Sequence, residues 1–168
     1  APDINADNGQ NVCLDVTVEN FDNIVSMQFS MNFDETVLEF TEFANLNLQD
    51  LTNGSFGTTG ASNGELTLSW LDQNVTGVTV PDGTVIFQAC FNVIGSMGQN
   101  SGFDFTGTPT SIEVVDGTGN TVNFNPTNGS VTVGMGGGGG GNDDLTITIS
   151  DVNGDNGQEV CVDVTVEN

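Results

Sequence analysis

The sequence predicts an all-β fold, a two-sheet sandwich of the jelly-roll type. Two observations lead to this prediction. Apolar and polar residues alternate with a period of two in one segment after another. These segments are separated by Gly, Asn and Asp rather than by amphipathic helical stretches. Short strands at this spacing, each with one apolar face, are typical of two sheets that pack face to face.

The expected strands follow one another along the chain, and in each every second residue is apolar so that one face packs inward. They lie at residues 12–18, 27–33, 66–70, 85–93, 112–114, 122–124 and 131–133. Asp116-Gly117 and Asn128-Gly129 are tight-turn signals between the last strands. Residues 34–43 carry the one helix-like pattern, which is too short to change the class. Trp70 is the largest expected core side chain.

The domain organisation follows from a glycine run and a repeat. Residues 136–141 are six consecutive glycines, which form a flexible spacer. Residues 151–168 then repeat residues 3–20 at an offset of 148 (151 minus 3), with 14 of 18 positions identical. We therefore expect a sandwich at residues 1–134, a glycine-rich linker at 135–142, and a tail at 143–168 that begins a second repeat or donates a strand.

The charge composition excludes several classes of function. The chain has no Lys, Arg or His and 23 acidic residues, a net charge of −23. Nucleic-acid binding requires cations, so it is excluded, and anionic membranes repel the chain. No apolar run is long enough for membrane insertion. Most general bases are absent, so we expect no enzyme; a paired-carboxylate hydrolase is the one mainstream catalytic class left open.

Calcium is the expected cofactor, because carboxylates without cations are stabilised by hard divalent ions, by water or by backbone N–H groups. Oxygen-bearing side chains alternate at two places, which are candidate metal sites: Asp3, Asn5 and Asp7, and their copies Asp151, Asn153 and Asp155. The twelfth position of the second segment is Val162, so neither is an EF-hand. The alternatives are an Asx-rich turn and a merely solvated acidic surface.

Four segments resemble the bacterial cohesin domain: residues 12–40, 63–70, 82–87 and 128–133. The similarity spans residues 3–133 in the order of the family. It implies a nine-stranded jelly-roll sandwich of cell-surface and scaffold proteins. In that family the module binds a calcium-loaded dockerin-like protein or serves as a building block. No dockerin-contacting residue carries over from the resemblance to a position of this sequence.

The cysteines predict a disulfide between Cys13 and Cys90. Both occupy the face of their strands opposite the apolar residues, as a bridge between neighbouring strands of one sheet requires. A disulfide indicates an oxidising location, here extracellular or on the cell surface of a bacterium that secretes the chain. Two free thiols in a reducing compartment are the alternative. Cys161, the copy of Cys13, then pairs with the neighbouring unit or stays free.

Three triplets fit the N-glycosylation pattern, beginning at Asn53, Asn74 and Asn128. All three lie in expected turns or loops, where a glycan could be attached. Glycosylation at these residues would make this chain a glycoprotein. Such triplets also arise by chance in a sequence rich in Asn and Thr.

The tail leads to the functional prediction. Leu145, Ile147 and Ile149 alternate with Thr in a clean strand pattern ahead of the second repeat, whereas only two residues precede Asp3. We therefore expect the first domain to lack its leading strand and a neighbouring copy to supply it, building an extracellular filament head to tail. Covalent repeats in one polypeptide are the alternative arrangement. The alternative function is a binding module that captures a dockerin-like partner.

Overall fold

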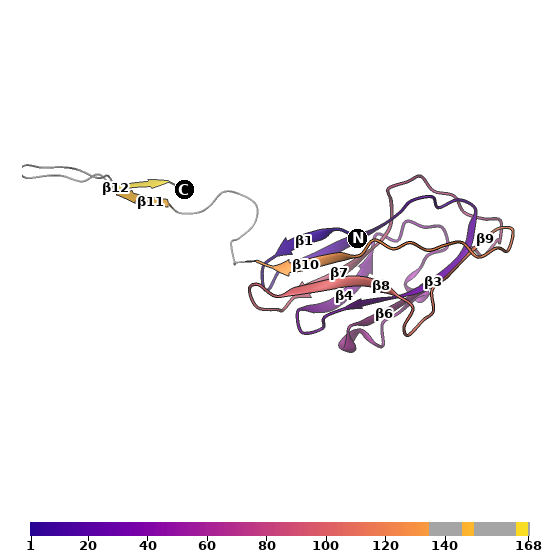
Figure 1. The fold of residues 1–168 in the computed structure, drawn as a ribbon, viewed down its shortest axis with the longest axis horizontal. Helices are drawn as coiled ribbons and strands as arrows, with labels where there is room; N and C mark the ends of the chain where they lie inside the picture. Colours follow the sequence, from indigo (N-terminus) through magenta and orange to yellow (C-terminus); the bar gives the residue numbers. More distant parts are fainter. Residues whose placement is uncertain (135–145, 150–163, 168) are drawn as a thin grey trace, which may run out of the picture. The chain divides into compact units, whose positions relative to one another are not determined.

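The computed structural model describes residues 1–134, 146–149 and 164–167, and the chain divides into two compact units, Ala1–Gly136 and Gly137–Asn168 (Figure 1). Among these described residues, none forms a helix long and apolar enough to span a membrane.

The first unit consists of ten strands and two short 3-10 turns, η1 (Asn53–Ser55) and η2 (Ala61–Asn63). The strands are β1 (Asp3–Ala6), β2 (Asn11–Val18), β3 (Ile24–Phe33), β4 (Leu38–Ala44), β5 (Phe56–Gly57), β6 (Glu65–Leu71), β7 (Thr84–Val93), β8 (Asn100–Thr106), β9 (Glu113–Asp116) and β10 (Gly129–Val133).

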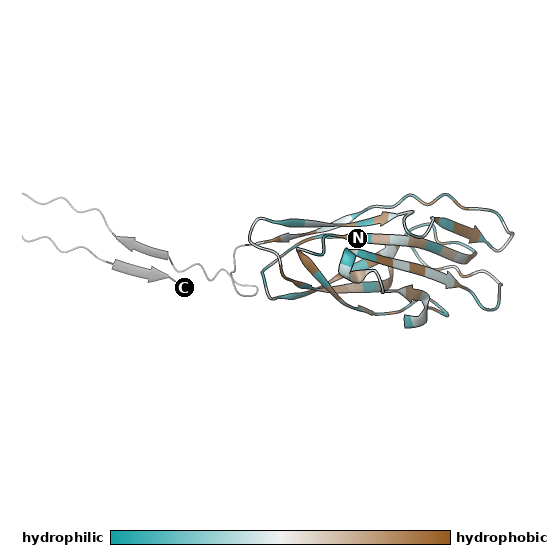
Figure 2. Cartoon of the chain, turned by 90° about the horizontal axis from the view of Figure 1, so that it is seen from below, coloured by the Kyte–Doolittle hydropathy of each residue, from teal (hydrophilic) through white to brown (hydrophobic). Residues whose placement is uncertain are grey.

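These strands form two sheets that pack face to face, as the sequence predicts. The larger sheet has the order β1-β10-β8-β3-β6-β5, with β9 also paired to β3, and we call it sheet A. The smaller sheet has the order β2-β7-β4, and we call it sheet B. All pairs are antiparallel except β1 with β10, which are parallel with Asp3 opposite Ser130. Apolar and polar residues alternate along the strands (Figure 2).

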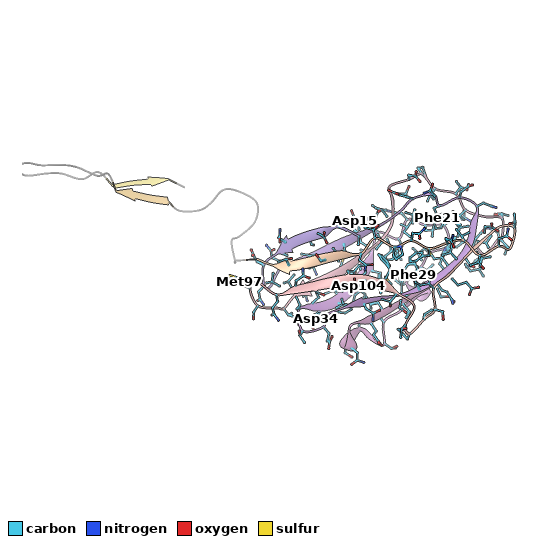
Figure 3. The ribbon with its side chains drawn as sticks, viewed as in Figure 1. Asp15, Phe21, Phe29, Asp34, Met97 and Asp104 are labelled. Carbon is cyan, nitrogen blue, oxygen red and sulfur yellow. A yellow bond between two sulfur atoms is a disulfide. The ribbon has the colours of Figure 1, made fainter. Side chains whose placement is uncertain are left out.

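The core lies between the two sheets and is rich in phenylalanine. Figure 3 shows Phe21 and Phe29 in the interior, both buried, and Met97 exposed at one end. Trp70 is buried as predicted, and its indole Nε1 donates a 2.7 Å hydrogen bond to the backbone oxygen of Gln49. The single polar atom of the largest side chain is therefore satisfied inside the core.

The sequence interpretation misses the short strands β1 and β5 and fails at three further elements. Residues 34–43, which carry the helix-like pattern, form a turn followed by β4, because pairing with β7 overrides local propensity. β8 was not among the expected strands, although Ser101, Phe103 and Phe105 alternate with polar or small residues. Residues 122–124 are not a strand; they lead along the edge of the sandwich towards β10.

Asn128-Gly129 is also not a turn, because Gly129 begins β10. A side chain at Gly129 would place its Cβ against the backbone oxygen of Pro2. The glycine therefore permits the close approach of two backbones, which is the other common reason for glycine in a strand.

In the second unit, β11 (Thr146–Ile149) pairs antiparallel with β12 (Val164–Glu167). In this register Thr148 lies opposite Thr165 and Ile149 opposite Val164. At the repeat offset of 148, β12 is the copy of residues 16–19, the end of β2 and the residue after it, and both read Val-Thr-Val-Glu.

Candidate functional site

Two surfaces of the first unit are suited to protein binding. The first is the outer face of sheet A, of which the backbone of Thr110 covers one position, Ser30, through hydrogen bonds in both directions. It carries polar side chains from the central strands: Ser26, Gln28, Asn32, Thr67, Ser69, Asp104 and Thr106. Leu71, 55% exposed, is the large apolar side chain at its end. A broad sheet face of this kind offers a flat, mixed polar and apolar contact area.

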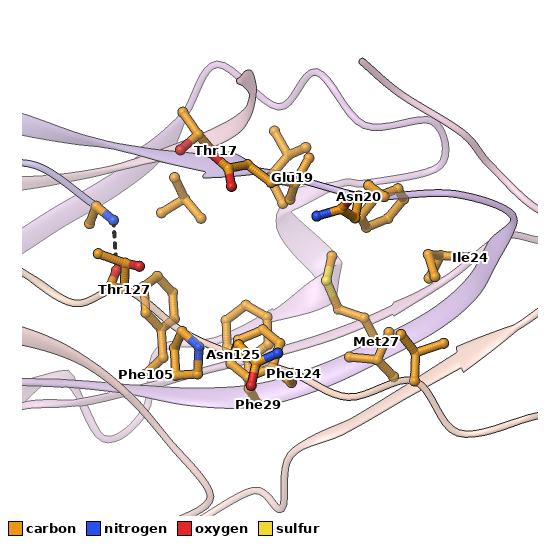
Figure 4. A pocket seen from close by; sticks show the side chains of 18 of the residues that line it. Thr17, Glu19, Asn20, Ile24, Met27, Phe29, Phe105, Phe124, Asn125 and Thr127 are labelled. Carbon is orange, nitrogen blue, oxygen red and sulfur yellow. Dashed lines mark hydrogen bonds between the residues drawn. The ribbon is translucent and has the colours of Figure 1, made fainter. Parts of the chain in front are cut away.

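The second surface is an apolar groove of about 720 Å³ between β2 and residues 122–127. Figure 4 shows Thr17 and Glu19 along one wall and Phe105, Phe124 and Phe29 along the other. The groove is an opening between the two sheets rather than a cleft for a small polar substrate.

The apolar lining of the groove is incompletely covered. Val18, Phe105, Val122 and Phe124 are only partly buried, although all four pack against the core. Phe124 stacks on Phe29 with ring centroids 5.3 Å apart. An additional element in the groove would bury the exposed parts of these side chains.

One edge of β2 faces the groove without a strand partner among the described residues, because sheet B begins with β2. Val16 is buried and Val18 half-buried, whereas Thr17 and Glu19 are exposed. An unpaired strand edge beside an apolar groove is the usual acceptor for an added strand.

The beginning of the chain closes one end of this groove. The amino group of Ala1 donates a 2.9 Å hydrogen bond to the backbone oxygen of Thr127, and Ser130 N donates a 3.2 Å bond to Pro2 O. Partial burial lowers the pKa of the Ala1 amino group below its ordinary value of 8.0, with a smaller opposing effect of Asp3.

Cys13 and Cys90 form the predicted disulfide. They are directly opposite each other in the β2–β7 pair, with Cα atoms 4.0 Å apart and 77 residues of sequence separation. Cys13 is exposed, whereas Cys90 is 2% exposed. The bridge joins the strand that lines the groove to the centre of sheet B.

Buried Asp72 shows how a carboxylate is held without cations. Its Oδ2 accepts hydrogen bonds from the backbone N–H groups of Thr76 (2.8 Å) and Gly77 (3.0 Å), and its Oδ1 accepts one from Asn74 (3.0 Å). Burial disfavours the charged form, but the hydrogen bonds outweigh it and hold the pKa of Asp72 below its ordinary 3.8. The sequence analysis did not single out Asp72; its Asp-x-Asn-x-Thr pattern was the available signal.

Two exposed turns use the same device. Hydrogen bonds from the Thr36 hydroxyl and N–H lower the pKa of Asp34. The Thr118 hydroxyl and the Asn120 N–H do the same for Asp116. Backbone N–H groups were one of the expected ways of stabilising the carboxylates, and these three residues use it.

The predicted calcium sites stay predictions. Asp3 accepts a 2.9 Å hydrogen bond from the hydroxyl of Ser130, and Asn5 follows it on β1, with Asp7 just beyond. In the described ranges, no three acidic, Cys or His side chains gather in a group that could hold a metal ion. Asp151, Asn153 and Asp155 lie outside the described residues.

The other predicted sites are the glycosylation sites, Cys161 and the donor strand, and only some of them lie within the described residues. Asn53, Asn74 and Asn128 are exposed in turns or loops, which is where an N-linked glycan requires them, and glycosylation stays a prediction. Cys161 and Leu145 lie outside the described residues. Ile147 and Ile149 lie in β11.

The comparisons with known proteins agree with this fold. The family model of the cohesin domain matches residues 2–133. No curated protein matches the sequence. The sixth cohesin of scaffoldin B from Acetivibrio cellulolyticus, in complex with a Cel5 dockerin, is similar with a TM-score of 0.65 and 20% identity over 79% of this chain and 94% of that chain.

Two further cohesins show the same likeness. The OlpA cohesin of Clostridium thermocellum, in complex with dockerin Doc918, has a TM-score of 0.66 and 17% identity over 79% of this chain and 94% of that chain. A non-cellulosomal cohesin from the archaeon Archaeoglobus fulgidus has a TM-score of 0.62 and 22% identity over 80% and 88%. The resemblance and the sandwich fold predicted from the sequence are thereby confirmed.

Proposed function

Because this chain belongs to the cohesin family, we propose that residues 1–134 capture a dockerin-like protein on the outer face of sheet A. Cohesin domains are non-catalytic binding modules, typically of extracellular scaffold and cell-surface proteins. The observation that supports the proposal most is the family match, together with dockerin complexes among the similar structures. The polar side chains of β6 and β8 and of both ends of β3 on the outer face of sheet A supply a contact area in this chain.

The charge of the chain constrains the partner. Glu65, Asp104 and Glu113 lie on or beside the outer face of sheet A, and the chain contains no Lys, Arg or His. Every ion pair across an interface must therefore use a cation of the partner. We expect a basic partner surface, with association that slows as salt screens the attraction.

Binding is tested by isothermal titration of the full chain with a panel of calcium-loaded dockerin domains. We expect one equivalent to bind, and we expect Ser69→Arg, at an exposed position of β6 on this face, to weaken binding at least about tenfold through steric block and lost contacts. Thr41→Arg, at an exposed position of β4 in sheet B, is the matched control and should bind like the parent chain. Absence of binding across the panel, or equal binding by both variants, contradicts the proposal.

The extracellular location is part of the same proposal. The Cys13–Cys90 disulfide supports it, since disulfides persist in oxidising compartments. It is tested by fractionating the source cells and probing the fractions with an antibody against the folded unit. Recovery only from the cytosolic fraction would contradict it.

A second candidate function is a structural module of a filament that assembles head to tail through residues 143–168. One observation favours it: the unpaired edge of β2 lies on an apolar groove, and the same sequence carries a spare strand after a glycine spacer. Negative-stain imaging of the full chain tests it, with linear polymers as the expected result and uniform single particles as the contrary one.

A further inference from the structure

We propose that the groove between β2 and residues 122–127 is an acceptor for a β-strand, and that residues 145–149 of a second copy of this chain are the strand it takes. The inference deepens the second candidate function, on which it rests, and it is independent of dockerin binding. It identifies the partner, the direction and the register of the contact.

The second unit supplies the register. β11 pairs antiparallel with β12, and β12 has the same four residues as positions 16–19, which are the last three residues of β2 and Glu19. Subtracting the offset of 148 from the β12 positions transfers the pairing to β2: Thr148 lies opposite Thr17, and Ile147 opposite Val18. On β2 this pairing would occupy the edge opposite β7, which has no strand partner in the described part of the chain.

Isoleucine and threonine alternate in the donor strand, as buried and exposed residues do in β2. Residues directly opposite in an antiparallel pair share a face of the sheet. Ile147 opposite Val18, and Ile149 opposite Val16, therefore enter the groove, while Thr148 joins exposed Thr17 on the outside. A shift of one residue would direct the threonines into the groove, so the pattern excludes odd shifts, and the β11–β12 pairing selects the register among the even ones.

The groove also explains why the strand would leave β12 for β2. The backbone hydrogen bonds are equivalent, because the two acceptor edges have identical sequence. β2 additionally offers the half-buried side chains of Phe105, Val122 and Phe124, which an inserted strand covers. Apolar surface removed from water is therefore the difference that favours exchange between copies.

The donor must displace the first two residues of the acceptor. At the repeat offset Ile149 and Ser150 correspond to Ala1 and Pro2, which line the groove and are held there by the bonds to Thr127 and Ser130. Removing Ala1 and Pro2 should therefore strengthen association between copies by at least about threefold. The donor strand would then enter the groove without first breaking the hydrogen bonds to Thr127 and Ser130.

Salt distinguishes this contact from dockerin capture. Asp143 and Asp144 precede the donor strand, and Asp15 and Glu19 line the acceptor, so both partners are anionic at the contact. Screening reduces that repulsion, and association between copies should tighten as salt rises. Dockerin capture should weaken under the same change.

The experiment is cysteine crosslinking between two variants of the full chain, each carrying Cys161→Ser. Thr17→Cys protein is mixed with Thr148→Cys protein under mild oxidation, and the crosslinked peptides are quantified by mass spectrometry. We expect at least about ten times more crosslink than with Thr146→Cys as donor, which is two residues out of register. Thr41→Cys, on an exposed position of β4, is the collision control for the acceptor.

A variant pair without added thiols gives an independent readout. Ile147→Asn removes an apolar side chain from the proposed groove contact, whereas Thr148→Asn changes the outward face of the same strand. Sedimentation velocity should show association lost at least about tenfold in the first variant and largely retained in the second. Neither change lies in the folded first unit, so a loss of association is not a loss of its fold.

The outcomes separate the contact from the function. Equal crosslinking in and out of register, or none, overturns the groove assignment even if filaments form. A disulfide within one chain of the Thr17→Cys/Thr148→Cys double variant overturns the second copy as the donor. Specific crosslinks in a preparation without filaments support the groove assignment and contradict the filament function.

Discussion

Loss of the Cys13–Cys90 disulfide should destabilise the first unit by about 4.5 kcal/mol. The bridge closes a loop with a sequence separation of 77 residues, and the chain-entropy relation for a loop of this length predicts roughly 15 cal/mol/K, or about 4.5 kcal/mol at 25 °C. Most of the effect acts on the unfolded chain, because β2 and β7 already pair along their length in the native sheet.

The assay is urea unfolding of the Cys13→Ala/Cys90→Ala variant and of the parent chain. With a slope of about 2 kcal/mol/M for a domain of this size, the midpoint should fall by roughly 2 M. The parent chain in reductant should match the variant, and Cys161→Ala should leave the midpoint of the first unit unchanged. A midpoint decrease below roughly 0.5 M would refute the loop-entropy reasoning.

Three further changes test the interior. Trp70→Phe leaves the backbone oxygen of Gln49 without its donor and opens space, and should cost about 2–4 kcal/mol in urea unfolding. Asp72→Asn should lower the urea midpoint at neutral pH. Because the folded-state pKa of Asp72 is depressed, the charged carboxylate stabilises the fold above pH 3.8, its ordinary pKa, and this stabilisation is lost as the pH falls through the folded-state pKa. The variant and the parent chain should therefore become equally stable in acid. Gly129→Ala places a Cβ against Pro2 and should cost about 1–3 kcal/mol, with faster amide exchange in β1.

Each of these has a control or a contrary result. Gly54→Ala meets only ordinary contact at 3.5 Å and should be nearly neutral, which separates crowding at Gly129 from a general effect of losing glycine. A difference between Asp72→Asn and the parent that persists or grows in acid would contradict the role assigned to the charged form. A Trp70→Phe chain as stable as its parent would show that the buried hydrogen bond contributes little.

Local alternation was sufficient to predict the β class and most strands. β2, β3, β6 and β7 follow the apolar pattern, because each has one face in the core and a more polar face turned away from it. The same parity placed Cys13 and Cys90 on one face of neighbouring strands. Residues 34–43 and 122–124 were assigned wrongly, since pairing with distant strands decides them and no local signal reports such pairing.

The sequence by itself determined the all-β sandwich, the disulfide, the absence of cations, and the repeat that places a strand pattern before a second copy of residues 3–20. Only the tertiary structure decided that the free edge of β2, the aromatic rings of Phe105 and Phe124, and the first residues of the chain meet around one groove. The physical reason is that alternation specifies which face of a strand is apolar, whereas sheet order and the junction between sheets specify which edges stay unpaired.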